Sequence, residues 1–540
     1  MLDLGKTFLQ SVERNPDAPA IVDGERSRCY AEWHADIAAL GEALVEMGLR
    51  KGERVLAVLQ NRYEMATLHW ACQFVGLVMT PLNWRAKPDE VVYCIENAEA
   101  RVVFFEAVSA AAVVSAARQC RVPAVAVGDI QSEAQADVQA DSQADIHTEI
   151  QSELQAGLRF DSLVAAHHGA ALAPAAQADD YSLMLYTSGT TGKPKGVPRR
   201  HRHERAAALA HVAQNLYGRG ERTLGVMPLY HTMGVRSLLA MALVDGLFVC
   251  MPRFDAAATL EAIARHRLTC LYLVPTLYHD MLACRERNGG DVSSVTKLGF
   301  AGAPMHDALL QRLDKVFQPR IFVNHYGSSE IYTVAIDADA TRKPGSAGKA
   351  GINTRLRVVT LGADDPGAAS ALAARGVEGE IVADLAGDEA FEGYWKRPDA
   401  DAKSIRNGWY RTGDTGYVDR DGDLYVTGRV DDMIISGGEN ISPVDIESVL
   451  SLHPAVDEVS VAGMPDERWG QRVVAFVKRK TAVDAAELDR YCQGSDLPNF
   501  KRPREYVFVN EIPKSPVGKV LRRKLSAGEY EPDTSTGTPA

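Results

Sequence analysis

Short apolar runs alternate with helical patterns in the first half of the chain, and this alternation limits the possible folds most strongly. Runs rich in valine, isoleucine, leucine and alanine lie at residues 54–59, 101–105, 122–127, 223–227, 247–251 and 270–274. Strands separated by helices favour parallel sheets, because each crossover helix covers a face of the sheet. The sequence therefore predicts an α/β protein.

The length predicts more than one domain. A chain of 540 residues exceeds what a single core usually holds. Shorter strands and turns follow Glu380, within a large N-terminal domain expected at residues 1–430. A small α+β domain is expected at 431–525, with a helix at 443–451, strands near 456–462 and 473–478, and a helix N-cap at Asp484.

Two segments have the composition of solvated chain. Residues 129–155 form a Gln/Ala/Asp/Ser tract with repeated Gln-Ala-Asp units, which predicts a surface insertion without chemistry. Residues 526–540 are rich in Ser, Thr, Gly and Pro, and we expect a disordered tail.

Composition excludes several functional classes. A net charge of −12 argues against a nucleic-acid partner. The eight cysteines are scattered singly, without the spacing of a zinc site, and no apolar run is long enough to span a membrane. We expect a reduced, cytoplasmic setting without membrane insertion. The sequence leaves the oligomeric state open, a homodimer included.

A glycine-rich loop follows the apolar run at residues 182–185. Glycines let backbone amides approach an anion, while hydroxyls and lysines supply donors and positive charge. Two residues separate Gly189 from Gly192 and Pro194 follows Lys193, so the loop is not a Walker A motif. The alternative is a flexible turn. The polyphosphate contacts predicted here are Thr187, Ser188, Gly189, Thr190, Thr191, Gly192 and Lys195.

Four further motifs follow this loop in a fixed order. They are Tyr326-Gly327-Ser328-Ser329-Glu330, Tyr410-Arg411-Thr412-Gly413-Asp414, residues 428–441 with Gly437-Gly438-Glu439, and residues 513–519, which end in Lys519. Together with the loop they resemble the motifs of the adenylate-forming superfamily, which includes acyl-CoA synthetases, firefly luciferase and the adenylation domains of peptide synthetases. The resemblance runs over residues 3–525, and it is strongest to the 4-chlorobenzoate–CoA ligase group. It implies a distorted barrel in the large domain and a mobile small domain.

The resemblance implies an ATP site. Tyr326 would lie against the adenine and Asp414 would accept hydrogen bonds from the ribose hydroxyls. Ser329 replaces the usual threonine of its motif but keeps the hydroxyl. The remaining implied nucleotide contacts are Gly302, Ala303, Gly327 and Arg429.

The resemblance also implies the chemistry. Glu330 would bind Mg²⁺ that contacts phosphate, and Lys519 would offset charge on the α-phosphate and the acid oxygen. His231 is a further catalytic candidate. The small domain would then rotate about Asp431 so that a thiol can reach the acyl adenylate. Regulation by acetylation of Lys519 is left open.

Coenzyme A would need fixed positive charge for its phosphates. The implied contacts are Arg85 on the large domain and Gly437, Gly438, Glu439, Trp469, Arg502 and Arg504 on the small one.

The acid pocket would lie near residues 228–234, 273–276 and 325–333. Bulky side chains there favour a compact aromatic or heteroaromatic acid, such as a benzoate, hydroxybenzoate or furoate, and hence a role in aromatic-acid degradation. The candidates are Thr232, Met233, His325, Ile331, Tyr332 and Thr333. His325 and Tyr332 are interpreted equally well as core side chains, and Arg236 is expected to point away from the acid.

The sequence leaves other functions open. The leading hypothesis is an ATP-dependent carboxylate–CoA ligase that forms an acyl adenylate. A medium-chain fatty acyl-CoA synthetase and an adenylation enzyme that loads a carrier protein are alternatives. The chain has no carrier domain, and Leu229-Tyr230-His231 stands where amino-acid-activating relatives have Phe-Asp. A nucleotide-binding pseudoenzyme is disfavoured because Lys519, Glu330, Asp414 and Arg429 are all present.

Overall fold

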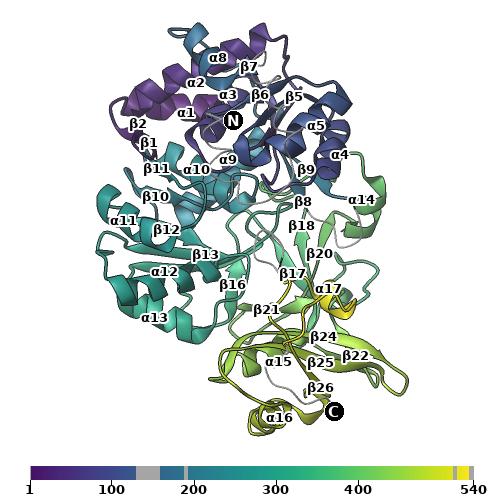
Figure 1. The fold of residues 1–540 in the computed structure, drawn as a ribbon. Coiled ribbons are helices and arrows are strands. Elements are labelled where there is room, and N and C mark those ends of the chain that lie inside the picture. Colours follow the sequence, from purple (N-terminus) through teal and green to yellow (C-terminus); the bar gives the residue numbers. More distant parts are fainter. Residues whose placement is uncertain (1, 129–157, 188–192, 515–519, 534–540) are drawn as a thin grey trace. The chain divides into compact units, whose positions relative to one another are not determined.

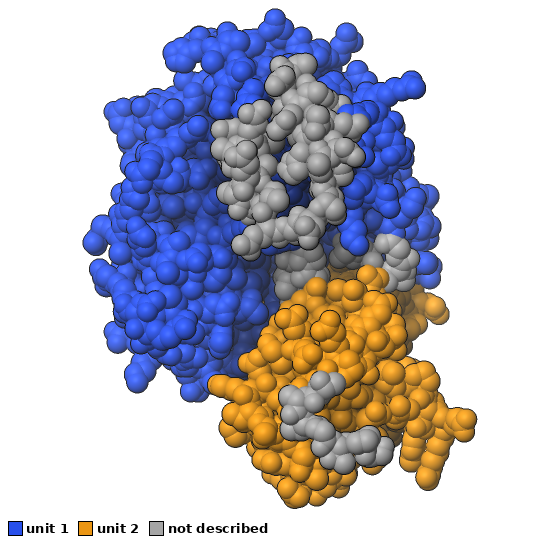
Figure 2. Space-filling view, viewed as in Figure 1, with its two compact units in different colours: residues 1–344, 349–355, 384–408 blue, residues 345–348, 356–383, 409–540 orange. Residues whose placement is uncertain are grey.

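The computed structural model describes residues 2–128, 158–187, 193–514 and 520–533. The chain forms two compact units, drawn in different colours in Figure 2. Unit 1 comprises residues 1–344, 349–355 and 384–408, and unit 2 comprises residues 345–348, 356–383 and 409–540. Residues on both sides of Asp431 belong to unit 2, and the domain boundary at residue 431 stays a prediction.

The first sheet of unit 1 carries the glycine-rich loop. Its strand order is β7-β6-β5-β3-β4-β8-β9, and every pair is parallel except β8 with β9. The strands are β3 (Arg54–Val58), β4 (Val78–Pro81), β5 (Ala100–Phe105), β6 (Ala124–Ala126), β7 (Leu158–Arg159), β8 (Tyr181–Thr187) and β9 (Lys195–Arg200). Helices α4 (Pro88–Ala98) and α5 (Ala110–Cys120) cover one face through an apolar cluster with β3 and β5.

The second sheet of unit 1 is also mostly parallel. Its order is β2-β1-β11-β10-β12-β13-β14-β15, with antiparallel pairs only at the two ends. The strands are β1 (Pro19–Asp23), β2 (Arg26–Cys29), β10 (Arg222–Gly225), β11 (Leu247–Cys250), β12 (Cys270–Leu273), β13 (Lys297–Ala301), β14 (Ile321–Tyr326) and β15 (Ala335–Asp337). Helices α11 (Ala256–His266), α12 (Pro275–Asn288) and α13 (Asp307–Phe317) lie along this sheet in Figure 1 and share an apolar cluster with it.

The main core of unit 1 joins the two sheets. Helices α1 (Leu4–Arg14), α2 (Tyr30–Glu46), α3 (Tyr63–Val75), α9 (His201–Gln214) and α10 (Thr232–Leu243) contribute to one apolar cluster that also contains residues of both sheets. Every residue of α3 is buried, as expected for a helix that is covered on all sides. Two short helices, α8 (Phe160–Ala166) and α14 (Pro398–Ser404), and the short strand β19 (Ile405–Arg406) complete the unit.

Unit 2 is built mostly from antiparallel strands. One group contains β17 (Leu356–Val359), β18 (Gly379–Asp384), β20 (Trp409–Val418) and β21 (Leu424–Arg429), and Ser346 and Gly348 of β16 (Ser346–Ala350) pair with β21. The other sheet has the order β23-β22-β25-β24, and β26 pairs in parallel with β25. Its strands are β22 (Ile434–Ser436), β23 (Glu439–Ile441), β24 (Val456–Asp466), β25 (Gly470–Arg479) and β26 (Glu505–Phe508).

Helices cover this second sheet of unit 2. Helices α15 (Pro443–Leu450) and α16 (Ala485–Gln493) share an apolar cluster with it, and α17 (Arg522–Ser526) contributes to a second cluster through Leu525. The mixed α/β fold class is confirmed. No helix within the described ranges has both the length and the apolar character that crossing a bilayer requires.

The expected disordered tail is wrong for residues 526–533. Tyr530 packs against Phe476, with 5.2 Å between the ring centroids. Asp533 forms an ion pair with Arg479 at 2.5 Å, and Pro532 bridges to Val509. An aromatic ring and a partly buried ion pair hold this segment despite its polar composition. Residues 534–540 and the insertion at 129–155 lie outside the described residues.

Candidate functional site

The glycine-rich loop connects two paired strands. Thr187 ends β8, Lys195 begins β9, and the two residues are partners in the antiparallel register. The ammonium of Lys195 lies 4.2 Å from the centroid of the Tyr394 ring. Ser188, Gly189, Thr190, Thr191 and Gly192 lie outside the described residues. The structure therefore defines the base of the predicted phosphate loop.

Two parallel strands of the second sheet end beside one another. Ala301 at the end of β13 pairs with His325, and Tyr326 is the last residue of β14. The exposed Gly302 and Ala303 follow β13 directly. In α/β proteins ligands bind outside the carboxyl ends of the strands. The structure thus brings the predicted adenine contacts Gly302, Ala303 and Tyr326 to one edge of the sheet, and their role stays a prediction.

The segment after β14 turns back tightly at Gly327. A Cβ atom on Gly327 would lie 2.1 Å from the carbonyl oxygen of Tyr332, so only glycine fits there. Ser328 N donates to Ile331 O at 2.9 Å, and Val334 N donates to Tyr326 O at 2.9 Å. This tight loop holds Ser329 and Glu330, both buried.

Glu330 is fixed at its main chain and at one carboxylate oxygen. Its Oε1 accepts a hydrogen bond from the Tyr394 hydroxyl at 2.7 Å. Its carbonyl oxygen accepts from Arg199 Nη1 at 3.1 Å and from the backbone N of Phe391 at 2.9 Å. Among the residues that the structure describes, Oε2 accepts no hydrogen bond. A carboxylate with one free oxygen suits a hard divalent cation.

The predicted acid-pocket residues Tyr332 and His325 lie in a buried polar network. Tyr332 donates to Glu204 Oε2 at 3.1 Å, and Arg199 pairs with Glu204 at 2.8 Å. Arg236 donates to the carbonyl oxygen of Tyr332 and lies 3.3 Å from His325 Nδ1. Burial lowers the pKa of His325 well below 6.5 and raises that of Tyr332 well above 10.

Most polar atoms of this network have protein partners, but Arg199 Nη2 and Arg236 Nε form no hydrogen bond with the described residues. His325 and Tyr332 are 3% and 2% exposed, so their interpretation as core side chains is favoured over contact with an acid substituent. Ile331 and Thr333 are also buried, and Thr333 N donates to Glu389 Oε2 at 3.0 Å. Arg236 points into the same network, beside His325 and Tyr332, and its orientation relative to the acid stays a prediction.

The other predicted acid-pocket residues begin α10. His231 is its N-cap, and its Nδ1 accepts from the backbone N of Met233 at 3.4 Å. Thr232 and Met233 are buried in the first turn, whereas His231 is partly exposed. This segment follows β10, whose carboxyl end lies at the same edge as those of β12 and β13.

In unit 2 the two predicted nucleotide contacts are partners. Arg429 Nη1 donates to Asp414 Oδ1 at 2.8 Å, and the two residues are paired in the register of β20 and β21. Thr412 accepts a hydrogen bond from Asp414 N at 3.0 Å. The guanidinium of Arg429 therefore holds the carboxylate of Asp414 in place.

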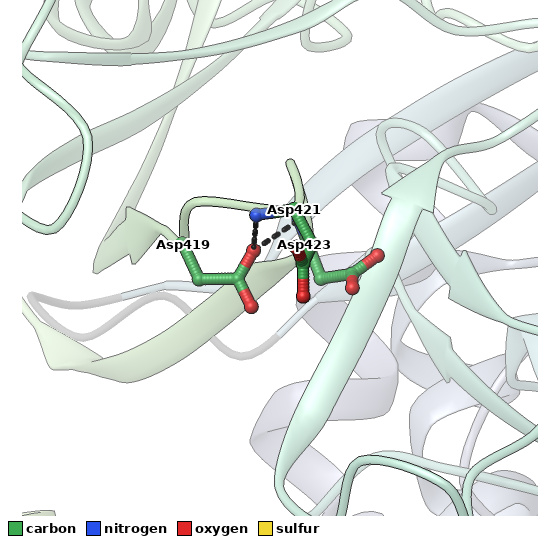
Figure 3. A group of neighbouring side chains, drawn as sticks. All are labelled: Asp419, Asp421 and Asp423. Atoms are coloured by element: carbon green, nitrogen blue, oxygen red, sulfur yellow. Dashed lines mark hydrogen bonds between the residues drawn. The ribbon is translucent and has the colours of Figure 1, made fainter.

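The acidic turn between β20 and β21 has a structural explanation. Figure 3 shows Asp419, Asp421 and Asp423 together, and Asp419 Oδ1 accepts from the backbone N of both other residues at 2.9 Å. Acceptance of two backbone hydrogen bonds by one aspartate is typical of tight turns. The cluster therefore shapes the hairpin that carries Asp414 and Arg429.

The predicted coenzyme A contacts of unit 2 fall into two groups. Gly437 has a φ of +61°, and a Cβ on it would lie 2.7 Å from the Trp469 ring. Gly437 N also donates to Trp469 O at 2.9 Å. Gly438 follows in the same exposed turn, and the exposed Glu439 begins β23.

The two arginines of the second group differ in their surroundings. Arg502 forms an ion pair with Asp489 at 3.3 Å, whereas Arg504 is exposed. No motif in the sequence indicates Asp489 as the partner of Arg502. In unit 1 the exposed Arg85 stacks on Trp84, with 3.6 Å from its guanidinium carbon to the ring centroid.

The predicted hinge residue Asp431 is exposed and follows β21. The next residue, Asp432, pairs with Arg522 at 3.0 Å, and Arg522 also pairs with Glu447 at 2.7 Å. Lys519 lies outside the described residues. Its catalytic role stays a prediction.

The chain matches two family models. The model described as AMP-binding enzyme covers residues 8–395, and that described as AMP-binding enzyme C-terminal domain covers residues 445–519. A 4-chlorobenzoate–CoA ligase of Arthrobacter sp. is 34% identical over 520 residues, 95% of this chain and 93% of the relative. A long-chain-fatty-acid–CoA ligase of Mycobacterium tuberculosis is 30% identical over 535 residues, 97% and 98% of the two chains.

A solved structure gives the same result. The o-succinylbenzoate CoA synthetase of Bacillus subtilis, in complex with an acyl-adenylate intermediate, superposes with a TM-score of 0.80. Its sequence is 26% identical, and the match covers 99% of each chain. The chain belongs to the family of AMP-binding enzymes and is an acid–thiol ligase of the AMP-forming acyl-CoA synthetase kind.

Proposed function

We propose that the protein joins an aromatic or heteroaromatic carboxylic acid to coenzyme A in two steps. In the first, a carboxylate oxygen attacks the α-phosphorus of ATP, the bond to the β-phosphate oxygen breaks, and pyrophosphate leaves. In the second, the thiolate of coenzyme A attacks the acyl carbon and AMP leaves. The observation that carries this proposal is the fixed position of the Glu330 carboxylate near the phosphate loop. Tyr394 donates a hydrogen bond to this carboxylate, and its ring contacts Lys195 at the end of the loop.

For the first step, residues of unit 1 would bind the triphosphate. The loop at residues 187–195 would hold the β- and γ-phosphates, with Lys195 adding charge at its end. Oε2 of Glu330 is available to Mg²⁺, which when bound would offset charge on the phosphate oxygens. Tyr326, Gly302 and Ala303 at the sheet edge would contact the adenine.

For both steps, residues of unit 2 would complete the site. Asp414 would bind the ribose, since Arg429 holds its carboxylate in a fixed position. Lys519 would stabilise the charge that develops as the anhydride forms. Rotation about Asp431 would then bring the turn at Gly437 and Gly438 to the acyl adenylate, so that the thiol can enter.

The proposed acid class rests on the relative named for 4-chlorobenzoate and on the bulk of His231 and Met233 at the start of α10. The relative named for long-chain fatty acids supports a medium-chain acid as the alternative. A compact aromatic ring and a flexible aliphatic chain require pockets of different shape. A substrate panel separates the two.

The test is the exchange of labelled pyrophosphate into ATP in the presence of benzoate, hydroxybenzoates, furoate, hexanoate or octanoate. Exchange that is fastest with a benzoate or furoate supports the proposal. Thioester formation with coenzyme A should show the same preference. Exchange only with hexanoate or octanoate would favour the fatty-acid alternative.

A further inference from the structure

Tyr394 lies between two groups of the proposed nucleotide site. Its side chain is buried, with 5% exposed. Its hydroxyl donates to Glu330 Oε1 at 2.7 Å, while Lys195 Nζ lies 4.2 Å from its ring centroid. One side chain therefore contacts both the carboxylate that is expected to bind a cation and the lysine at the end of the phosphate loop.

Backbone hydrogen bonds hold the segment around Tyr394 against both neighbours. Phe391 N donates to Glu330 O at 2.9 Å, and Trp395 N donates to Gly196 O at 2.8 Å, directly after Lys195. Tyr394 N donates to Asp401 Oδ1 at 2.8 Å. The position of the tyrosine is thus set by main-chain contacts on either side of it.

Side-chain contacts restrict Tyr394 further. The Phe391 ring packs edge-on against it, with 5.0 Å between centroids. Arg199 donates to the carbonyl oxygens of both Glu330 and Glu389, which ties the segment to the loop after β14. A ring held on several sides has few accessible rotamers, so its hydroxyl is directed at a fixed point.

The hydrogen bond from Tyr394 determines how the Glu330 carboxylate can be used. A neutral hydroxyl that donates to an ionised carboxylate forms a charge-assisted bond, which is stronger than one between neutral groups. The bond occupies Oε1 and leaves Oε2 without a partner among the described residues. An unanchored glutamate would have to lose side-chain entropy when it binds a cation, whereas this one is already ordered.

We propose that Tyr394 is a positioning residue that holds Glu330 so that its free oxygen can bind the divalent cation accompanying ATP. This inference rests on the proposed function, in which Glu330 binds that cation. In this proposal Tyr394 acts through its hydrogen bond to Glu330. Because Tyr394 also contacts Lys195, the same side chain positions Glu330 and packs against the end of the phosphate loop.

The test compares Tyr394→Phe with wild type in pyrophosphate exchange over a range of Mg²⁺ concentrations. Loss of one hydrogen bond to a charged group should raise the half-saturating Mg²⁺ concentration roughly tenfold or more. By calorimetry, affinity for ATP with Mg²⁺ should fall by a similar factor. Affinity for AMP without metal should be unchanged.

Tyr30→Phe is the matched control. Tyr30 is another buried tyrosine of unit 1, and its hydroxyl lies 2.8 Å from Gly246 O and 3.1 Å from Met241 O. Removing this hydroxyl should lower stability while leaving the Mg²⁺ dependence unchanged. The comparison separates the loss of protein stability that follows removal of any buried hydroxyl from a specific loss of affinity for Mg²⁺.

Glu330 variants complete the test. Glu330→Gln should raise the Mg²⁺ requirement, and adding Tyr394→Phe to it should cause no further rise, because both changes act on one carboxylate. If Tyr394→Phe does not fold, Glu330→Asp breaks the same hydrogen bond and should raise the requirement likewise. An unchanged Mg²⁺ dependence in Tyr394→Phe, or fully additive effects in the double variant, would overturn the inference. A wild-type protein that binds no ATP would instead refute the proposed function.

Discussion

Arg199 and Glu204 form an ion pair at 2.8 Å in which neither side chain has any exposed surface. Arg199 also donates to Glu330 O and Glu389 O, and Glu204 also accepts from Tyr332. A buried charge that loses its partner is costly because water cannot replace the lost contacts. This pair therefore links the stability of unit 1 to the loop that carries Glu330.

Replacement of Arg199 should strongly destabilise the protein. Arg199→Met leaves the Glu204 carboxylate buried without its cation, and we expect a loss of about 3–5 kcal/mol in the free energy of unfolding. Urea unfolding measures it. The control is Arg265→Met, whose ion pair with Glu25 is exposed, and this change should cost about 0–1 kcal/mol. Similar losses in both variants would contradict the prediction.

Loss of the Asp414 carboxylate should weaken nucleotide binding. Asp414→Ala removes both the proposed ribose acceptor and the partner of Arg429, so affinity for AMP should fall roughly tenfold. Calorimetry measures this affinity directly. Asp457→Ala, which removes another cross-strand ion pair of unit 2, should bind AMP as wild type does. Unaltered affinity in Asp414→Ala would exclude the ribose contact.

The two arginines near β26 should respond differently in the thioester step. Arg504→Ala removes an exposed charge and should raise the KM for coenzyme A several-fold, roughly the effect of one hydrogen bond to a charged group, with pyrophosphate exchange unchanged. Asp489→Asn frees Arg502 from its ion pair and should lower that KM or leave it unchanged. The exposed Arg490 of α16 offers a control through Arg490→Ala. Equal loss of both half-reactions in Arg504→Ala would argue against a coenzyme A contact.

Buried histidines should make unit 1 sensitive to acid. Burial lowers the pKa of His69 to about 3 and that of His201 to about 4, from 6.5 for an ordinary histidine. The unfolded chain therefore takes up protons below pH 6.5 while the folded chain does not, so stability falls as the pH drops from 6.5 towards 4. Each such group contributes a slope of up to about 1.4 kcal/mol per pH unit.

Urea unfolding at pH 7.5 and pH 5.0 tests this prediction. His69→Gln should show a smaller loss of stability between the two pH values than wild type. His279→Gln, at an exposed position, should keep the wild-type pH dependence. An identical pH dependence in His69→Gln and wild type would contradict the assignment.

Removal of the last segment should destabilise unit 2. A chain ending at Gly528 lacks Tyr530 and Asp533 and leaves Arg479, 7% exposed, without its ion-pair partner. We expect a loss of roughly 3 kcal/mol, the usual cost of breaking such a pair. A chain ending at Asp533 serves as the control and should unfold as the full chain does. Equal stability of the two truncated chains would mean that these contacts contribute nothing.

Local sequence patterns predicted the helices and strands better than the side-chain contacts between distant residues. The helix after Asp484 and strands near 456–462 and 473–478 were expected. The structure pairs these strands as β24 and β25, and Asp484 accepts from Glu487 N at 2.7 Å. The order of motifs also identified the family. The sequence could not show that Tyr332 and His325 are buried among Arg199, Glu204 and Arg236, because the contact of Tyr332 with Glu204 joins residues 128 positions apart and that of Arg236 with His325 joins residues 89 positions apart. For the same reason it missed Tyr394 as the partner of Glu330 and Asp533 as the partner of Arg479.

Arg522 connects the C-terminal segment to the residues that follow the proposed pivot. It follows Lys519 by three positions and is clamped to Asp432 and Glu447, the first of which comes immediately after the proposed pivot. A rotation of the backbone at residue 431 would therefore also move Arg522, because its guanidinium is ion-paired with both carboxylates. Arg522, Asp432 and Glu447 would then turn together about the proposed pivot at Asp431.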